Sequence, residues 1–560
     1  MHFSTSKYAK DASIKLPNSE IVQPSSLVRW LGIWFDPGLN FKQHVAIRAT
    51  QAKASFYRMA RLANTEKGLS PKALRQLYIA CVTSIADYGS IIWWKDQASF
   101  KKTLQLLQNL ALRKILGVFK TSPIKPMEVE AALCPPEIRL NAGIRQYAFR
   151  LLKISSSHPV NTIMDKLATE REALNTIATP QRKLSKLTQL EKIMNSIEED
   201  FDPLTLEKID HFHFPPWKRN TPYKVNISKL AKEDAAIVHN LAFKYRCKNT
   251  ITIYTDASST LNGIGIGIGI AVILSNGQVS HQETINIGVN QLVYNGELLG
   301  VTRAIEYASS IAQPGEKFKI YLDNQAGLYR LKIPSDAPGQ ICQIRAIKAT
   351  ETLLRKGTEI SLNWVPGHTS VEGNELADAL AKEATKQRSS SNETSFAFLG
   401  MDIKRTKSEE WNTLLYSSNS AYSKIYPWKT SSKIGIPENT KRSSISTLFQ
   451  LKIDHGYFKS YLQRFGISAN DNCRYGKRES PNHLLLSCPL YKSTRRIFKK
   501  NNPTSRLTMK YLLHTKAGII KTLEFIEKTK IATRSWHLTR MQENVEQESE
   551  GEEDELRENG

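Results

Sequence analysis

Residues 251–258 read ITIYTDAS, a run of β-branched and aromatic residues that closes on an acid. This composition predicts a β-strand with Asp256 near its carboxyl end. The next segment, residues 264–274, alternates isoleucine with glycine and then becomes fully apolar. Its glycines recur with period two and lack the G-x-G-x-x-G or G-K-S/T spacing of a phosphate-binding loop. We therefore interpret it as a second strand with one small-residue face.

Further strands and helices are predicted on the carboxyl side of this pair. Strands are expected at 279–287, 318–322 and 360–365, and helices at 290–311 and from after His368 through Ala384. Three strands followed by alternating helices and strands predict a mixed five-stranded sheet flanked by helices. The expected fold class of residues 249–387 is therefore α/β.

Four carboxylates stand at the ends of these elements, namely Asp256, Glu297, Asp323 and Asp378. Strand ends and helix starts can converge at one edge of a sheet. Clustered carboxylates repel one another unless cations neutralise them, and oxygen ligands without cysteine favour Mg²⁺ or Mn²⁺. A single acid at a strand end is more often a turn former or a helix cap, so the spacing alone leaves both interpretations open.

Four segments together resemble the type 1 ribonuclease H family in their order and separation: TDAS (255–258), YNGELLGVTRAI (294–305), LDNQAGL (322–328) and WVPGHTSVEGNELADALAKEA (364–384). The resemblance implies a ribonuclease H-like fold and an endonuclease that hydrolyses the RNA strand of RNA–DNA hybrids by a two-metal mechanism. It assigns two Mg²⁺ or Mn²⁺ ions to the four carboxylates, and proton transfer or product release to His368. The positions that would contact the hybrid are Ser258, Asn295, Asn324 and Gln325.

Residues 1–154 are predicted to be mostly helical, with apolar periodicity at 44–63, at 70–82 and at 104–116. MHFSTSK (1–7), VRWLGIWFD (28–36), IADYGSIIWW (85–94) and residues 107–133 resemble the thumb and connection of non-LTR retrotransposon reverse transcriptases. The paired aspartates of the polymerase turn, Y/F-x-D-D, are absent. We expect a chain derived from a retrotransposon polyprotein without its polymerase active site. Residues 155–248 are predicted to be a linker with some helix.

Residues 388–541 are expected to form a small, irregular and partly helical region. Its segment NCRYGKRESPNHLLLSCPLY (472–491) resembles a C-x-C-G…H…C knuckle that keeps Cys473, His483 and Cys488 but has Tyr475 at the second cysteine position. Structural zinc takes four nitrogen or sulfur ligands, so zinc binding is not expected and the knuckle is interpreted as degenerate. The acidic residues 542–560 are predicted to be disordered.

The net charge of +25 over 560 residues favours a polyanionic partner. Six cysteines are too sparse for a disulfide framework, and neither a signal peptide nor a transmembrane run is visible, so we expect an intracellular protein, nuclear or cytoplasmic, without a membrane partner. An RNA–DNA hybrid and a separate reverse transcriptase are the expected partners, and the oligomeric state is left open. Two alternatives remain: a catalytically inactive nucleic-acid-binding remnant and a non-enzymatic accessory subunit of a polymerase.

Overall fold

The computed structural model describes Met1, Phe3 and residues 13–154, 158–176, 187–261, 263–417, 420–499 and 507–542. The chain forms two compact units. Unit 1 comprises residues 1–143 and 406–560, and unit 2 comprises residues 144–405. The divisions fall inside two helices, α7 (Pro136–Lys153) and α15 (Phe396–Tyr416). The predicted acidic tail lies outside the described residues from 543 onward.

Unit 2 is built on a mixed sheet of six strands in the order β5-β10-β9-β6-β7-β8. The strands are β5 (Lys224–Asn226), β6 (Thr250–Ser258), β7 (Gly267–Ile273), β8 (Val279–Asn286), β9 (Lys317–Leu322) and β10 (Glu359–Trp364). β5, β10, β9 and β6 run parallel, whereas β7 and β8 are antiparallel to their neighbours. The five expected strands are confirmed. The sixth, β5, comes from the predicted linker, where three residues carry too little pattern to reveal a strand.

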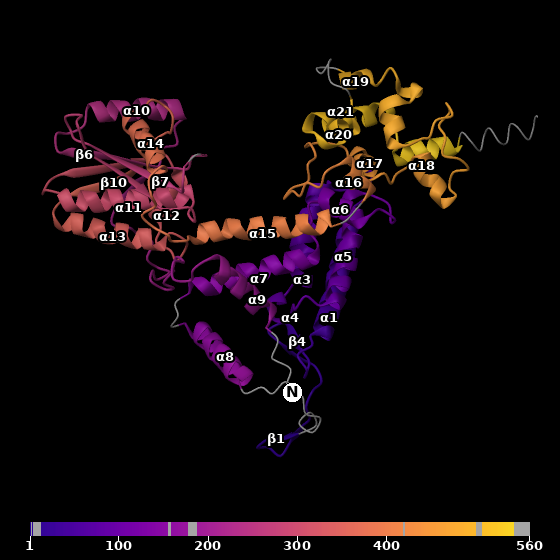
Figure 1. Ribbon diagram of the computed structural model, residues 1–560, viewed down its shortest axis with the longest axis horizontal. Coiled ribbons are helices and arrows are strands. Elements are labelled where there is room, and N and C mark those ends of the chain that lie inside the picture. The colour runs from indigo at the N-terminus through magenta and orange to yellow at the C-terminus, as the bar shows by residue number, and fades with distance from the viewer. Residues whose placement is uncertain are drawn as a thin grey trace, which may run out of the picture. The chain divides into compact units, whose positions relative to one another are not determined.

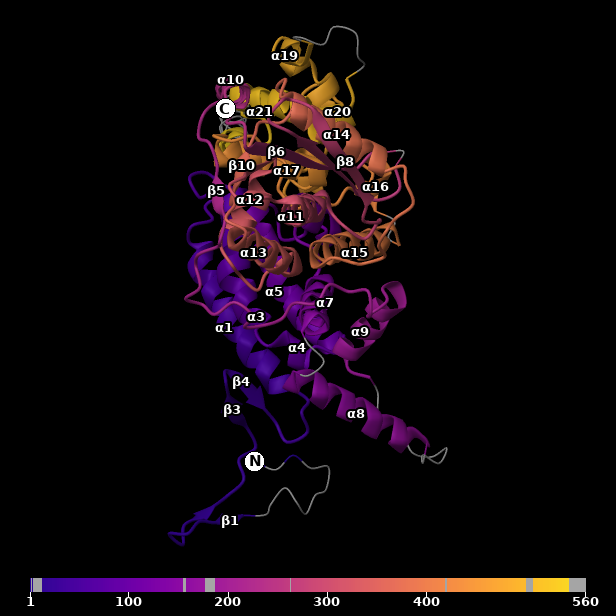
Figure 2. The same cartoon turned by 90° about the vertical axis from the view of Figure 1, so that its left-hand side faces the viewer.

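Helices cover both faces of this sheet (Figures 1 and 2). α11 (Val293–Ile311), α12 (Gln325–Lys332) and α13 (Gln340–Arg355) lie on one face, and α10 (Lys232–Lys244) and α14 (Glu372–Ala384) on the other. Successive residues of β6 point to opposite faces: Ile253 packs with the α11 side and Tyr254 with the α14 side. Asp256 therefore shares a face with Tyr254. Unit 2 also contains α8 (Pro159–Thr176), α9 (Gln189–Asp200) and the parts of α7 and α15 that fall within residues 144–405.

The glycines of β7 allow α14 to approach the sheet closely. A Cβ on Gly267 would lie 2.1 Å from the carbonyl oxygen of Ala381, and one on Gly269 would lie 2.1 Å from that of Ala377. The small-residue face predicted from the period-two glycines is thus the surface on which α14 packs. Because α14 carries Asp378, these glycines set how near that carboxylate comes to the sheet.

Unit 1 is mostly helical, as predicted for its N-terminal part. Its longer helices are α1 (Lys42–Ala60), α2 (Pro71–Tyr78), α5 (Ala98–Leu116), α6 (Ile124–Glu130), α17 (Arg442–Ile453), α20 (Met509–His514) and α21 (Lys516–Thr529). Ser70 caps α2, since its side chain accepts the Ala73 N–H, and Pro71 occupies the first turn. The shorter elements are β1 (Ile14–Lys15), β2 (Ile21–Val22), β3 (Val28–Trp30), β4 (Ile33–Phe35), η2 (Ile79–Thr83), α3 (Ser84–Ala86), α4 (Ser90–Trp93), α16 (Ala421–Ile425), α18 (Lys459–Leu462), η3 (Gln463–Phe465), η4 (His483–Ser487), η5 (Pro489–Tyr491) and α19 (Arg496–Lys499).

A buried polar cluster joins the N-terminal and C-terminal segments of unit 1. The Lys452 ammonium on α17 lies 2.8 Å from the Glu130 carboxylate at the end of α6, and the Tyr422 hydroxyl donates to the same carboxylate at 2.6 Å. The Lys452 and Glu130 side chains are 6% and 9% exposed. Burial alone would raise the pKa of Glu130, but Lys452 and His514 hold it below its usual value. Residues more than 300 positions apart thus share one core.

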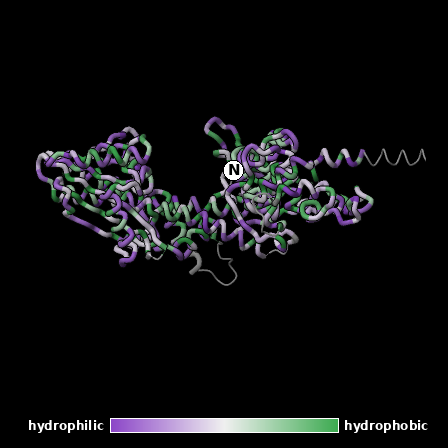
Figure 3. Tube along the Cα trace, turned by 90° about the horizontal axis from the view of Figure 1, so that it is seen from above, coloured by the Kyte–Doolittle hydropathy of each residue, from purple (hydrophilic) through white to green (hydrophobic). Residues whose placement is uncertain are grey.

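No helix among the described residues is long and apolar enough to cross a membrane. Hydrophilic and hydrophobic residues alternate along the helices instead (Figure 3).

Candidate active site

Three of the predicted carboxylates converge at one edge of the unit 2 sheet. Asp256 stands near the carboxyl end of β6, Asp323 directly follows β9, and Glu297 lies in the second turn of α11. Because β6 and β9 are adjacent and parallel, their carboxyl ends meet at the same edge. Each side chain offers one oxygen, and these oxygens all lie within 4.8 Å of one another. Asp256 and Glu297 are buried, at 7% and 2% exposure.

The fourth carboxylate, Asp378, approaches from α14. Asp378 does not belong to the set whose oxygens all lie within 4.8 Å of one another. Its charge nevertheless raises the pKa of both Asp256 and Asp323. The Lys382 ammonium, one helical turn further on, lies 2.6 Å from the Asp378 carboxylate. In the structure Lys382 partly neutralises the charge of Asp378.

The electrostatics of the group favour the binding of cations. Burial, Asp323 and Asp378 together raise the pKa of Asp256 to about 7. The pKa of Glu297 is raised well above its usual value by burial and then by the two neighbouring aspartates. Burial and Asp378 also raise the pKa of Asp323. Each shift reports that the protein alone does not stabilise this much negative charge.

One oxygen of Glu297 is left without a partner. The Ala257 N–H and the Asn324 side chain donate to this carboxylate, whereas its Oε2 is buried and accepts no hydrogen bond among the described residues. A buried unsatisfied carboxylate oxygen is costly unless a donor or a cation reaches it. The oxygen-only donor set fits Mg²⁺ or Mn²⁺.

The loop that carries His368 passes close to Asp323. A Cβ on Gly367 would lie 2.1 Å from Asp323 Oδ2, so a side chain there would push the Asp323 carboxylate aside. His368 is exposed, has a φ of 57°, and its charge acts to lower the pKa of Asp323. The Trp364 Nε1 donates to the Asp323 carbonyl at 2.9 Å and so fixes the start of the same loop.

Of the four predicted hybrid-contacting residues, Asn324 has the clearest structural role. Its Oδ1 accepts the Gly327 N–H at 3.2 Å as the cap of α12, and its amide donates to Glu297. Asn295 has a buried Oδ1 that finds no partner within the described ranges, Gln325 is exposed, and Ser258 is half-buried opposite Gly267. A cleft of about 610 Å³ in unit 2 includes Asn295 among its lining residues and none of the four carboxylates.

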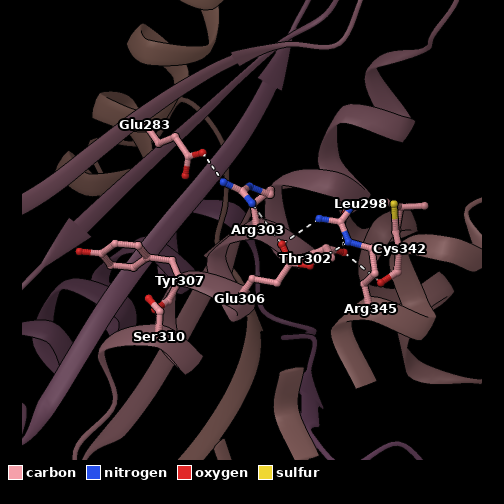
Figure 4. Close-up of polar contacts among 9 residues, drawn as sticks. All are labelled: Glu283, Leu298, Thr302, Arg303, Glu306, Tyr307, Ser310, Cys342 and Arg345. Atoms are coloured by element: carbon pink, nitrogen blue, oxygen red, sulfur yellow. Dashed lines mark hydrogen bonds and ion pairs between the residues drawn. The ribbon is translucent and has the colours of Figure 1, made fainter. Parts of the chain in front are cut away.

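Ion pairs that the sequence did not reveal fix α11, the helix of Glu297 (Figure 4). Arg303 on α11 lies 2.8 Å from Glu283 on β8, and Arg345 on α13 makes two 2.8 Å contacts with Glu306 on α11. The Thr302 hydroxyl adds a 3.1 Å bond to the Cys342 carbonyl. These partners are far apart in sequence, so only tertiary structure identifies them. They hold α11 in place on both sides and thereby position Glu297.

A second convergent group lies in unit 1. Cys473, His483 and Cys488 place their ligand atoms within 4.8 Å of one another, and the Cys473 Sγ lies 3.1 Å from the His483 Nε2. The Tyr475 side chain is 54% exposed. Within the described part of the chain, this triad and the carboxylate group are the two candidate metal-holding clusters.

A model of a known protein family matches the segment that carries the four carboxylates. Residues 248–386 match the family model for RNase H. The chain is 27% identical over 142 residues to a retrovirus-related Pol polyprotein from the type-1 retrotransposable element R1 4 of Nasonia vitripennis, a match covering 25% of this chain and 36% of that protein. It is 26% identical over 176 residues to a probable RNA-directed DNA polymerase from transposon BS of Drosophila melanogaster, covering 31% of this chain and 18% of that one.

The two solved structures that follow each match about a quarter of the chain. RNase H1 from Halobacterium salinarum NRC-1 matches at 25% identity over 24% of this chain and 96% of its own, with a TM-score of 0.19. LC11-RNase H1 in complex with an RNA/DNA hybrid matches at 15% identity over 24% of this chain and 98% of its own, with a TM-score of 0.19.

Proposed function

Since residues 248–386 form an RNase H domain, we propose that the protein hydrolyses the RNA strand of RNA–DNA hybrids at Asp256, Glu297, Asp323 and Asp378. The observation that carries the proposal is the convergence of three of these acids, with oxygens within 4.8 Å and pKa values raised by burial and mutual repulsion. Near neutral pH the charge of such a group has to be shared with protons or with cations.

Two Mg²⁺ or Mn²⁺ ions held by these carboxylates would supply an activated water and neutralise the charge that develops on the leaving 3′ oxygen. The chain's own groups prepare the site. The Asn324 amide and the Ala257 N–H fix one side of Glu297 and leave Oε2 free as a ligand. His368 stands exposed beside Asp323, where it can pass a proton to or from solvent during product release.

We assign recognition of the hybrid to polar residues near the four carboxylates. Asn295 offers a buried, unpartnered amide oxygen, and Gln325 offers an exposed amide at the start of α12. Ribose 2′-hydroxyls distinguish RNA from DNA and both donate and accept hydrogen bonds, so amide side chains suit them. We also assign Ser258, at the end of β6, to contact with the nucleic-acid backbone.

The matches to retroelement polyproteins suggest a polymerase as the partner of this nuclease. Because the chain covers 36% and 18% of the two relatives, the activities of those whole proteins are not transferred to it. The 560 residues contain no paired aspartates of the Y/F-x-D-D type, so no polymerase step is assigned to them. Co-purification with a separate reverse transcriptase tests this partnership.

The decisive test is cleavage of an end-labelled RNA–DNA hybrid by the purified chain with Mg²⁺ or Mn²⁺. We expect products with 5′-phosphate and 3′-hydroxyl ends, and no cleavage by Asp256→Asn or Asp323→Asn. Glu359→Gln is the matched control, because this acid is 76% exposed at the far end of β10. Retained hybrid binding without cleavage by the wild type would identify a binding remnant, and cleavage that survives both aspartate variants would point to a contaminant.

A further inference from the structure

Unit 1 contains a cleft of about 550 Å³ between the C-terminal end of α5, the N-terminal half of α17 and the C-terminal end of α21. Besides Arg113, six cations line it: Lys67, Lys114, Lys120, Lys441, Lys530 and Arg534. Glu66 is the one carboxylate in its lining, and none of the six cations pairs with a carboxylate within the part of the chain that the structure describes. We call this recess the basic cleft. Its unneutralised charge calls for an anionic occupant.

The recess is built by close packing of segments remote in sequence. Gly117 ends α5 with a φ of +73°, and a Cβ there would lie 2.3 Å from Ser446 Oγ on α17. Only glycine lets the two helices approach this closely. Arg113 also belongs to the scaffold, since its guanidinium donates to the Lys120 carbonyl at 2.8 Å and to the Asn109 carbonyl at 3.2 Å. The loop that carries Lys120 is thus held in place.

Gln450 leaves an acceptor unused in the lining of the basic cleft. Its Nε2 donates to the Gly117 carbonyl at 2.9 Å, whereas its Oε1 is buried and has no partner among the described residues. The residue is 5% exposed. A buried acceptor without a donor is destabilising until one arrives. An occupant with N–H or O–H donors as well as negative charge would satisfy both the acceptor and the cations.

Aromatic rings form another part of the wall. Phe119 and Tyr457 both line the cleft, with ring centroids 4.9 Å apart, and Tyr457 stacks on His537 at 5.1 Å. Ser443 and Ser444 in the first turn of α17 also line it. Among the described residues no side chain caps this helix, and the first N–H groups of a helix have no intrahelical partner. Lysines and the N–H groups at a helix start bind phosphates, and half-buried aromatic rings stack against bases.

We propose that the basic cleft binds a few nucleotides of single-stranded nucleic acid, RNA or DNA. Its volume of about 550 Å³ lies in the range of small-ligand pockets, about 300–1,000 Å³, so it can hold bases and phosphates of a short single strand. Phosphates contact the six cations, a base or ribose donor reaches Gln450 Oε1, and bases stack on the aromatic wall. This site belongs to unit 1, shares no residue with the carboxylate group, and does not depend on the proposed nuclease activity.

Fluorescence anisotropy with labelled 12-nucleotide single strands of RNA and of DNA, in EDTA and over a series of salt concentrations, tests the proposal on the full chain. We expect the Lys114→Ala/Lys441→Ala/Lys530→Ala variant to bind at least about tenfold more weakly. The slope of log affinity against log salt should fall by about 2, because three phosphate contacts are lost. Whichever of RNA and DNA binds more tightly identifies the natural strand.

The matched control is Lys53→Ala/Lys72→Ala/Lys516→Ala, which removes the same charge from exposed positions of unit 1 outside the cleft. An equal loss in both triple variants, or no loss in the cleft variant, would overturn the proposal. So would wild type that responds to inorganic phosphate but binds neither strand. A second measurement needs no variant: photocrosslinking of a 4-thiouridine or 4-thiothymidine strand should label peptides containing Phe119 or Tyr457. Labels confined to other peptides would refute the site.

Discussion

Replacing Gly269 with alanine probes how closely α14 must approach the sheet. The new Cβ would lie 2.1 Å from the Ala377 carbonyl oxygen and 2.5 Å from the Ala381 nitrogen, both of them backbone atoms that cannot rotate away. Ordinary contacts lie near about 3.5 Å, so α14 has to retreat by about 1 Å. Ala377 immediately precedes Asp378, and the displacement therefore reaches the carboxylate directly.

We expect this variant to lose about 1–3 kcal/mol of stability, as overpacked cores do. Cleavage should fall on the order of 100-fold, because misplacing a reacting group by about 1 Å has that effect. The assay is single-turnover cleavage of a labelled hybrid at saturating Mg²⁺, well below the melting temperature, with Tm measured in parallel. Gly400→Ala is the control, since a Cβ there meets nothing within 4 Å. Wild-type rate and Tm for Gly269→Ala would refute the close-approach argument.

Three further predictions follow from the buried charges. Asp256→Asn should raise the Tm measured at pH 7.5 without divalent cations, because it removes a charge that burial and two neighbouring aspartates disfavour. The same variant should not cleave the hybrid when divalent cations are added. A Tm below that of the wild type would contradict this prediction. The raised pKa of Asp256, about 7, means that the folded protein keeps a proton which the unfolded chain releases near pH 4. The stability of the cation-free protein should therefore fall as pH rises from about 4 through about 7. The Tm gain from Mg²⁺ should accordingly be larger at pH 8 than at pH 5.5, and a gain that does not change with pH would count against the shared carboxylate site. In unit 1, Lys452→Met should lower the free energy of unfolding, measured by urea denaturation, by about 3–5 kcal/mol, because Glu130 is left buried without its cation. Adding Glu130→Gln should restore most of that free energy. Losses that simply add in the double variant would show that the two residues are not coupled.

The sequence was informative wherever a short-range pattern carries the signal. The β-branched and aromatic run at 251–258 predicted β6, and the alternation over 264–274 predicted β7. The acids at element ends included the three that converge. The period-two glycines predicted a small-residue face, although not that α14 would cover it. That Asp256, Glu297, Asp323 and Asp378 act in catalysis stays a prediction until variants are assayed, as do the domain boundaries at 154, 248 and 387.

Features that depend on long-range contacts were not predictable. β5 is three residues long and is defined only by its pairing with β10. α12 and α13 lie between β9 and β10, where no helix was predicted. The Arg303 and Arg345 ion pairs join residues up to 39 positions apart, and the Lys452 contact with Glu130 spans 322. No local pattern reports such partners, since each is chosen by the packing of whole elements.

The buried contact between Glu130 and Lys452 has a consequence for how the chain folds during synthesis. Unit 1 is discontinuous, so α5 and α6 emerge from the ribosome long before α17, which covers part of their surface. At about 5–20 residues per second the first segment waits on the order of half a minute for its partner. Unit 2, continuous in sequence, completes its core in the meantime. A translation product that stops shortly after residue 405 would therefore carry a folded unit 2 and an N-terminal segment with an uncovered apolar surface. Chaperones bind such surfaces and proteases degrade the chains that expose them.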